Sequence, residues 1–120
     1  MDLQDILSKQ AEFDKAHGWD TLSLSNEKRL QAIERELVGL MGEVGEVANL
    51  IKKARLVSGR DRSESKAFLD IVPAVNEELT DVFIYLLRMF QITNADIEAE
   101  YLNKLDINKH RFKQYENDTP

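Results

Sequence analysis

Two pairs of acidic side chains stand at the same spacing in two apolar stretches of the sequence. Glu43 and Glu46 occur in GEVGEVANLIKK, and Glu78 and Asp81 occur in EELTDVFIYLLR, offset by 35 residues. In both stretches the second acid is followed by a valine that begins an apolar run. At about 100° per residue, acids three positions apart lie on one side of a helix, here at the border of its apolar stripe. If the two helices pack together, four carboxylates converge, and such oxygen ligands suit Mg²⁺, with Mn²⁺ as a substitute.

The spacing alone does not separate a metal site from a solvated border. A chain with 22 acidic residues among 120 contains about four such pairs by chance, and four are present here. Acids at the edge of an apolar stripe usually point into solvent, whereas four converging anions require a cation between them. A di-iron site is disfavoured, because neither His17 nor His110 follows a glutamate by three residues.

Two glycines interrupt the first acidic stretch. Gly42 and Gly45 stand directly before and between its glutamates, and each costs a helix interior about 1 kcal/mol relative to alanine. Our hypothesis is that their missing side chains leave room for a neighbouring helix or for a metal-bound phosphate.

Helical periodicity runs through nearly the whole sequence and predicts a single all-α domain, residues 1–120. β-Branched residues do not alternate over any useful length, and the chain has only two prolines. The helices are expected at 2–16, from Ser25 or Asn26 to the polar stretch ARLVSGRDRSES, at about 71–92 behind an Asp70 cap, and at about 95–114 behind an Asn94 cap. Pro73 would then lie in a first turn, and residues 115–120 would form a frayed tail. Four helices with short connections predict an antiparallel four-helix bundle, and its remaining apolar stripes predict a homodimer or homotetramer.

Charge and composition narrow the classes of function. The formal net charge is −6, which argues against a nucleic-acid partner but allows a small anion that is held through a metal. No stretch reaches the ~20 apolar residues of a membrane span, and MDLQDILSKQ lacks the basic start of a signal peptide. The sequence has no cysteine, so disulfides and thiolate metal sites are excluded. A cytoplasmic protein without a membrane partner is therefore expected.

Three segments, GLMGEVGEVANLIKK, EELTDVFIYLLRM and LNKLDINKHRF, resemble in this order the MazG-like all-α NTP pyrophosphatases. This superfamily includes the dCTP pyrophosphatases and the dimeric all-α dUTPases, and the resemblance extends from about residue 10 to residue 112. It implies the superfamily's helical bundle and the Mg²⁺-dependent hydrolysis of a nucleoside triphosphate to the monophosphate and pyrophosphate, a reaction that cleans the nucleotide pool. It also makes Glu43, Glu46, Glu78 and Asp81 the catalytic residues and the magnesium ligands.

The resemblance further assigns residues that bind the substrate. Lys104 and Asn108 match a lysine and an asparagine that reach the nucleotide, and Arg111 matches the basic residue after them. These three positions share one helical face. Tyr85, one turn after the second acidic pair, matches a tyrosine of the dCTP pyrophosphatase branch. The segment AEFDKAHGWD resembles the part of the family whose aromatic residues enclose the base, which makes Trp19 a candidate base contact, although a structural anchoring role fits its position equally well.

Two alternatives to this function stay open. The 31 residues between Glu46 and Glu78 form a longer spacer than the simplest family pattern, which leaves the choice of substrate undecided. The same chemistry on another substrate, such as phosphoribosyl-ATP, is the first alternative. The second is a non-catalytic helical module whose acidic borders only set the register of an oligomer.

Overall fold

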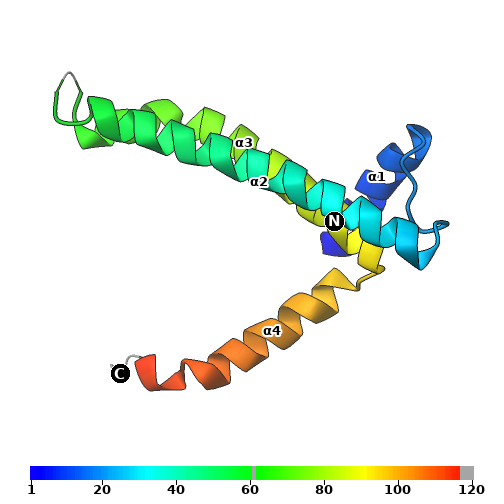
Figure 1. Cartoon of the computed structure of the whole chain (residues 1–120). Helices are drawn as coiled ribbons and strands as arrows, with labels where there is room; N and C mark the ends of the chain where they lie inside the picture. Colours follow the sequence, from blue (N-terminus) through cyan, green and yellow to red (C-terminus); the bar gives the residue numbers. More distant parts are fainter. Residues whose placement is uncertain (61, 117–120) are drawn as a thin grey trace.

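The computed structural model describes residues 1–60 and 62–116, which fold into four α-helices (Figure 1). The helices are α1 (Leu3–Ala16), α2 (Asn26–Val57), α3 (Glu64–Thr93) and α4 (Ile97–Arg111), followed by a short 3₁₀ turn, η1 (Lys113–Tyr115). The predicted all-α class with four helices is therefore confirmed. Most of the predicted frayed tail, residues 117–120, lies outside the described residues, and Tyr115 itself ends the 3₁₀ turn.

Each α-helix begins at a side chain that caps it. The side chains of Asp2, Ser25, Ser63 and Asp96 accept hydrogen bonds from backbone N–H groups in the first turns of the four helices. Each cap satisfies an N–H group that has no partner within its helix, and a cap of this kind contributes about 1 kcal/mol. The local sequence therefore sets where each helix begins.

The third helix is longer than predicted. It begins at Glu64 behind the Ser63 cap rather than near residue 71, and it continues through Pro73. An interior proline removes one backbone hydrogen bond, but α3 packs against α2 on both sides of this position, and that packing keeps the helix continuous. Asp70, the predicted cap, instead forms an ion pair with Arg62.

The connection into α4 also differs from the prediction. Asn94 does not cap α4; it ends α3 in the left-handed conformation, with φ of 56°. Asparagine enters this region more readily than most residues and can therefore stop a helix. The cap of α4 is Asp96, so the helix spans Ile97–Arg111 rather than residues 95–114.

The two long helices form an antiparallel hairpin, which is the main packed unit of the chain (Figure 1). α1 packs against α3 at the end of the hairpin from which α4 departs. The buried cluster that joins α1, α3 and α4 there consists of Leu7, Leu87 and Ile97. No helix among the described residues combines the length and the apolar character that crossing a membrane would require.

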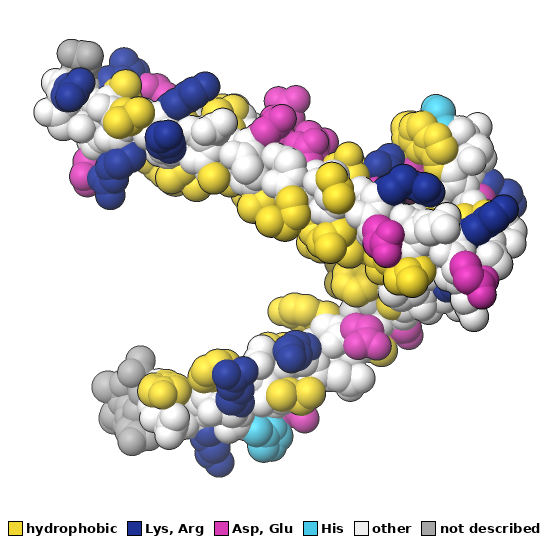
Figure 2. All heavy atoms as spheres, in the orientation of Figure 1, with side chains coloured by type: hydrophobic (Ala, Val, Ile, Leu, Met, Phe, Trp, Pro, Cys, Tyr) yellow, Lys and Arg dark blue, Asp and Glu magenta, His cyan; other side chains and the backbone are white. Residues whose placement is uncertain are grey.

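α4 diverges from the hairpin, so one chain leaves wide apolar surfaces uncovered (Figure 1). The radius of gyration of the Cα atoms is 18.8 Å, whereas a compact domain of this length has about 14 Å. Hydrophobic side chains gather on the side of the hairpin that faces α4 and on the opposing side of α4 (Figure 2). Exposed members on these helices include Leu37, Val38, Met41, Leu79, Phe83, Tyr101, Leu102 and Leu105. The helices of a bundle are thus present, but α4 does not close that bundle within one chain.

Candidate metal centre and the adjoining cavity

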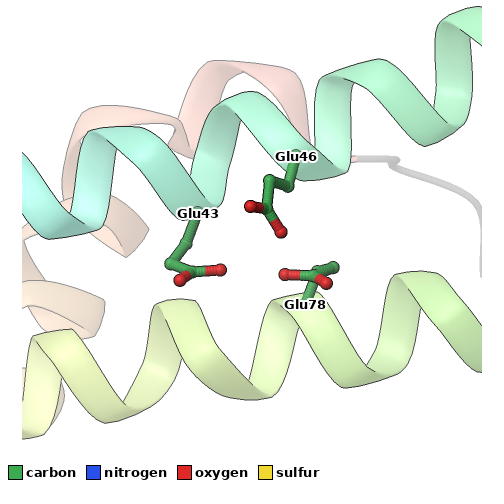
Figure 3. A group of neighbouring side chains, drawn as sticks. All are labelled: Glu43, Glu46 and Glu78. Carbon is green, nitrogen blue, oxygen red and sulfur yellow. The ribbon is translucent and has the colours of Figure 1, made fainter.

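Three glutamates from the two long helices converge on the α2–α3 hairpin (Figure 3). Glu43 and Glu46 lie one turn apart on α2, and Glu78 approaches them from α3. Each residue offers one carboxylate oxygen, and these oxygens all lie within 4.8 Å of one another. The three-residue spacing on α2 places both of its glutamates on the side that faces α3. The two acidic stretches of the sequence therefore meet in space.

Among the residues that the structure describes, no basic side chain forms an ion pair with the three carboxylates. Hydrogen bonding to Glu43, and then to Glu46, raises the pKa of Glu78 to about 7, and burial and the negative charge of both neighbours add to this shift. Without a proton between the carboxyl groups, Glu43 Oε2 and Glu78 Oε2 are buried acceptors that have no hydrogen-bond donor among the described residues. Facing acceptors of this kind are satisfied either by a proton held between them or by a cation. The raised pKa and the unpartnered oxygens therefore have one physical cause.

The donor atoms of this group fit a hard divalent cation. All of them are carboxylate oxygens, the ligands that Mg²⁺ and Mn²⁺ prefer. Mg²⁺ typically takes only one or two protein carboxylates and completes its shell with water and substrate phosphates. Glu46 is exposed, so the group is open to solvent on its side and can admit such ligands.

Asp81, the fourth predicted ligand, lies one turn after Glu78 on α3 and is partly buried. Its carboxylate is not part of the group of oxygens within 4.8 Å, so its role as a ligand stays a prediction. The space beside the glutamates is open: a Cβ added to Gly42 or Gly45 would meet nothing within 4 Å outside its own helix backbone. Among the described residues no neighbouring helix approaches either glycine this closely, so the hypothesis that they leave room for a helix or for a metal-bound phosphate stays a prediction.

A cavity of about 380 Å³ lies farther along the hairpin, beneath the loop that follows α1. Its wall includes Asp14 from α1, Trp19 from the loop, Glu36 from α2, and Arg88 from α3. Glu36 precedes Glu43 by seven residues, which is two helical turns on the same face, or about 10 Å along α2. The cavity and the three glutamates therefore follow one another along the same side of the hairpin.

Arg88 is held in this wall by an acid and two aromatic rings. Its Nε donates a hydrogen bond to Asp14 Oδ1 at 3.3 Å. Its guanidinium carbon lies 5.4 Å from the ring centroid of Trp19 and 5.6 Å from that of Tyr85. Asp14 is only 2% exposed and also accepts a hydrogen bond from Gln10 Nε2 at 2.9 Å. Because the buried carboxylate is paired and hydrogen-bonded, its charge is tolerated, and the arginine is fixed in place.

Glu36 lies beside this ion pair without a hydrogen bond at one of its oxygens. Its Oε2 is buried, has no partner among the described residues, and is 4.0 Å from Arg88 Nη1. Burial, partly opposed by the charge of Arg88, raises the pKa of Glu36 above its usual range.

Tyr85 lies between the cavity and the glutamates. Its ring covers Gly39 on α2, where a Cβ would overlap the ring atoms. This is a close contact that only glycine permits, and it fixes how α2 and α3 approach one another. Trp19, the other aromatic residue predicted to bind substrate, is 54% exposed and stacks on His17, with ring centroids 5.1 Å apart. Both side chains are near the cavity, and their contact with a substrate stays a prediction.

The three residues predicted on the last helix lie away from both features. Lys104, Asn108 and Arg111 are on α4, which diverges from the hairpin (Figure 1). Lys104 and Arg111 are exposed, and the guanidinium of Arg111 lies 5.0 Å from the ring centroid of Phe112. A single chain therefore does not bring these groups to the glutamates.

Of the four wall residues named above, Trp19 is a predicted site residue, whereas Asp14, Glu36 and Arg88 are not. Asp14 and Arg88 are 74 positions apart, and no local motif connects them. One signal was present, because Asp14 stands seven residues after Leu7 and thus on the buried face of α1. A charge in that position predicts a buried partner, but not which residue the partner is.

Comparison with known proteins finds homologues over most of the chain. dCTP pyrophosphatase 1 of Rattus norvegicus is 30% identical over 111 residues, and that of Homo sapiens is 30% identical over 117 residues. Each comparison covers 92% of this chain, and the chain spans 58% of the length of each relative. No protein-family model matches the chain, and no solved structure matches it significantly. The homologues confirm the predicted resemblance to the MazG-like NTP pyrophosphatases.

Proposed function

We propose, proceeding from this homology, that the chain is a divalent-metal-dependent pyrophosphohydrolase that cleaves a nucleoside triphosphate to the monophosphate and pyrophosphate. The observation that carries the proposal is the group of three carboxylate oxygens within 4.8 Å, open on one side. The relatives' name, dCTP pyrophosphatase 1, makes dCTP the first substrate to test. Such a reaction would clean the nucleotide pool of the cytoplasm.

The residues of the glutamate group would hold Mg²⁺, or Mn²⁺ in its place. Glu43, Glu46 and Glu78 supply the ligand oxygens, and Asp81 would add a fourth carboxylate from α3. When bound, the metal supplies the positive charge that neutralises phosphate oxygens and activates water. Glu78 would hold the metal as an ionised carboxylate, having released its proton to solvent. Glu46, which is exposed on the open side, would accept a proton from the attacking water.

The nucleoside would extend from the glutamates towards the cavity. The two features are about 10 Å apart along the hairpin, which suits a nucleotide whose phosphates lie at one end and whose base lies at the other. Tyr85 would flank the sugar, and Trp19 would contact the base at the far wall.

A second copy of the chain would complete this site. The apolar faces of the hairpin and of α4 are both uncovered in one chain (Figure 2). We infer a homodimer or homotetramer in which α4 of one chain packs across the hairpin of another. Lys104, Asn108 and Arg111 would then reach the triphosphate and neutralise the charge that the metal leaves.

The test is release of pyrophosphate from dCTP and a panel of other nucleoside triphosphates, with Mg²⁺ and with EDTA. Metal-dependent release supports the proposal. No release from any substrate would refute it and favour the alternative, a non-catalytic helical module. Glu78→Gln should lower turnover by about a hundredfold or more, since it removes a metal ligand. Glu77→Gln is the matched control, because Glu77 is the exposed neighbour on the same helix. Circular dichroism checks that both variants stay helical.

A further inference from the structure

Arg88 is a charged side chain that the proposed chemistry does not use. Its side chain is only 23% exposed, so its charge contributes little to the solvated surface of the protein. It lines the cavity and stands two turns after Asp81 on α3. It is therefore about 10 Å along the helix from the proposed metal ligands. Because Arg88 lines the cavity, it can contact the part of a ligand that lies there.

The contacts of Arg88 leave one edge of the guanidinium available. Asp14 takes Nε, and Nη1 is 4.0 Å from Glu36 Oε2, which is too long for a hydrogen bond. Within the part of the chain that the structure describes, the two terminal nitrogens thus keep N–H groups for a ligand. The guanidinium carbon lies 5.4 Å from the ring centroid of Trp19 and 5.6 Å from that of Tyr85, so these contacts position the fork before anything binds.

A guanidinium has donors only, and its terminal nitrogens match two neighbouring acceptor atoms. Guanine offers such a pair at O6 and N7, and cytosine offers one at O2 and N3. Uracil and thymine carry a hydrogen on N3 between their carbonyls, and adenine places an amino group beside N7. An arginine fixed at the base end of the cavity therefore separates cytosine and guanine from uracil, thymine and adenine.

We infer that Arg88, positioned by Asp14 and by the rings of Trp19 and Tyr85, reads the base of the substrate by donating two hydrogen bonds to adjacent acceptor atoms. This inference rests on the proposed nucleotide function and adds a specificity-determining residue to it. Asp14 is a positioning residue, since it touches Arg88 and sits behind it in the wall. One bidentate contact of this kind discriminates between bases by about tenfold or more.

The experiment compares kcat/KM for dCTP, dGTP, dUTP and dATP. The native chain should prefer dCTP or dGTP over dUTP and dATP, and the better of the first two identifies the base. Arg88→Met should lower that preference about tenfold or more, and Arg88→Lys should restore it only in part, because an ammonium has no fork. Asp14→Asn should weaken the preference less. Arg55→Met is the matched control, since Arg55 is exposed and pairs with Glu64 at the far end of the hairpin.

Two results would overturn the inference. One is a native chain without preference for dCTP or dGTP. The other is an Arg88→Met chain that loses activity equally on all four substrates, as a structural or phosphate-binding arginine would. If Arg88→Met misfolds because Asp14 is left unpaired, the double variant Asp14→Asn/Arg88→Met removes both charges and is measured instead.

A binding measurement separates this inference from the proposed reaction. Trp19 is the only tryptophan of the chain and lines the cavity, so its fluorescence reports binding there. Titration with CMP, GMP, UMP and AMP in EDTA should quench Trp19 selectively with CMP or GMP, and Arg88→Met should remove the selectivity. If the chain hydrolyses no triphosphate but shows this quenching, the proposed reaction fails and base reading stands. Equal quenching, or none up to millimolar concentrations, refutes base reading.

Discussion

If the three glutamates hold Mg²⁺ as proposed, the proton that Glu78 retains near neutral pH should make this binding dependent on pH. With a pKa of about 7, Glu78 carries a proton in most molecules at pH 6 and in few at pH 8. Binding of Mg²⁺ should therefore release about 0.9 proton per site at pH 6 and about 0.1 at pH 8. By the same reasoning the apparent affinity should be about tenfold weaker at pH 6 than at pH 8.

The metal-free fold should respond to pH in the opposite sense. The pKa of Glu78 in the fold, about 7, lies above its usual value of 4.5, so the folded chain keeps a proton that the unfolded chain has lost. This contribution to stability is fully present below pH 4.5 and is lost as the pH rises through 7. The melting temperature without metal should therefore fall between pH 5 and pH 8, and Mg²⁺ should restore it at pH 8.

Isothermal titration calorimetry in two buffers of different ionisation enthalpy counts the released protons. Glu78→Gln should abolish the proton release and remove the part of the pH dependence of melting that comes from Glu78, whereas the part that comes from the raised pKa of Glu36 should remain. Glu77→Gln should leave both the proton release and the pH dependence unchanged. If Mg²⁺ binds at pH 6 without releasing a proton, Glu78 is already ionised in the metal-free chain. The inference that the neighbouring carboxylates keep a proton on Glu78 would then be wrong.

Three further predictions follow from the packing and from the open shape of the chain. Gly39→Ala should lower the free energy of unfolding by about 1–3 kcal/mol, because the added Cβ overlaps the Tyr85 ring. Gly45→Ala has open space around it and should raise that free energy by up to about 1 kcal/mol. Urea unfolding measures both changes. An equal mixture of the inactive variants Glu78→Gln and Lys104→Met should recover about a quarter of native turnover in a dimer if α4 serves the partner's site, and no recovery would place α4 at its own hairpin. Light scattering should find at least a dimer, and a monomer at micromolar concentration would contradict the inferred role of the uncovered apolar faces.

The local features of the chain were predictable from the sequence because they depend on neighbours within a turn or two. The helical class and the order of the four helices follow from periodicity, and spacing places each acidic pair on one side of its helix. The predicted start of α3 is wrong for a local reason: proline favours the first turn of a helix, but packing against α2 carries α3 through Pro73. The predicted Asn94 cap is wrong for a similar reason, because asparagine favours helix starts but also enters the left-handed region, where Asn94 ends α3.

The sequence by itself determined that two apolar helices would each carry a pair of acids, because residue type and a three-residue spacing are enough to place them on a helix face. The tertiary structure decided which of those acids meet. Antiparallel packing sets Glu78 against both Glu43 and Glu46 and leaves Asp81 outside the group. It also brings Asp14 to Arg88 across 74 residues. Such contacts depend on how far one helix slides along another, which a single sequence does not encode in any local pattern. The divergence of α4 is likewise a property of packing, since its exposed apolar side chains are covered only when a second surface is present.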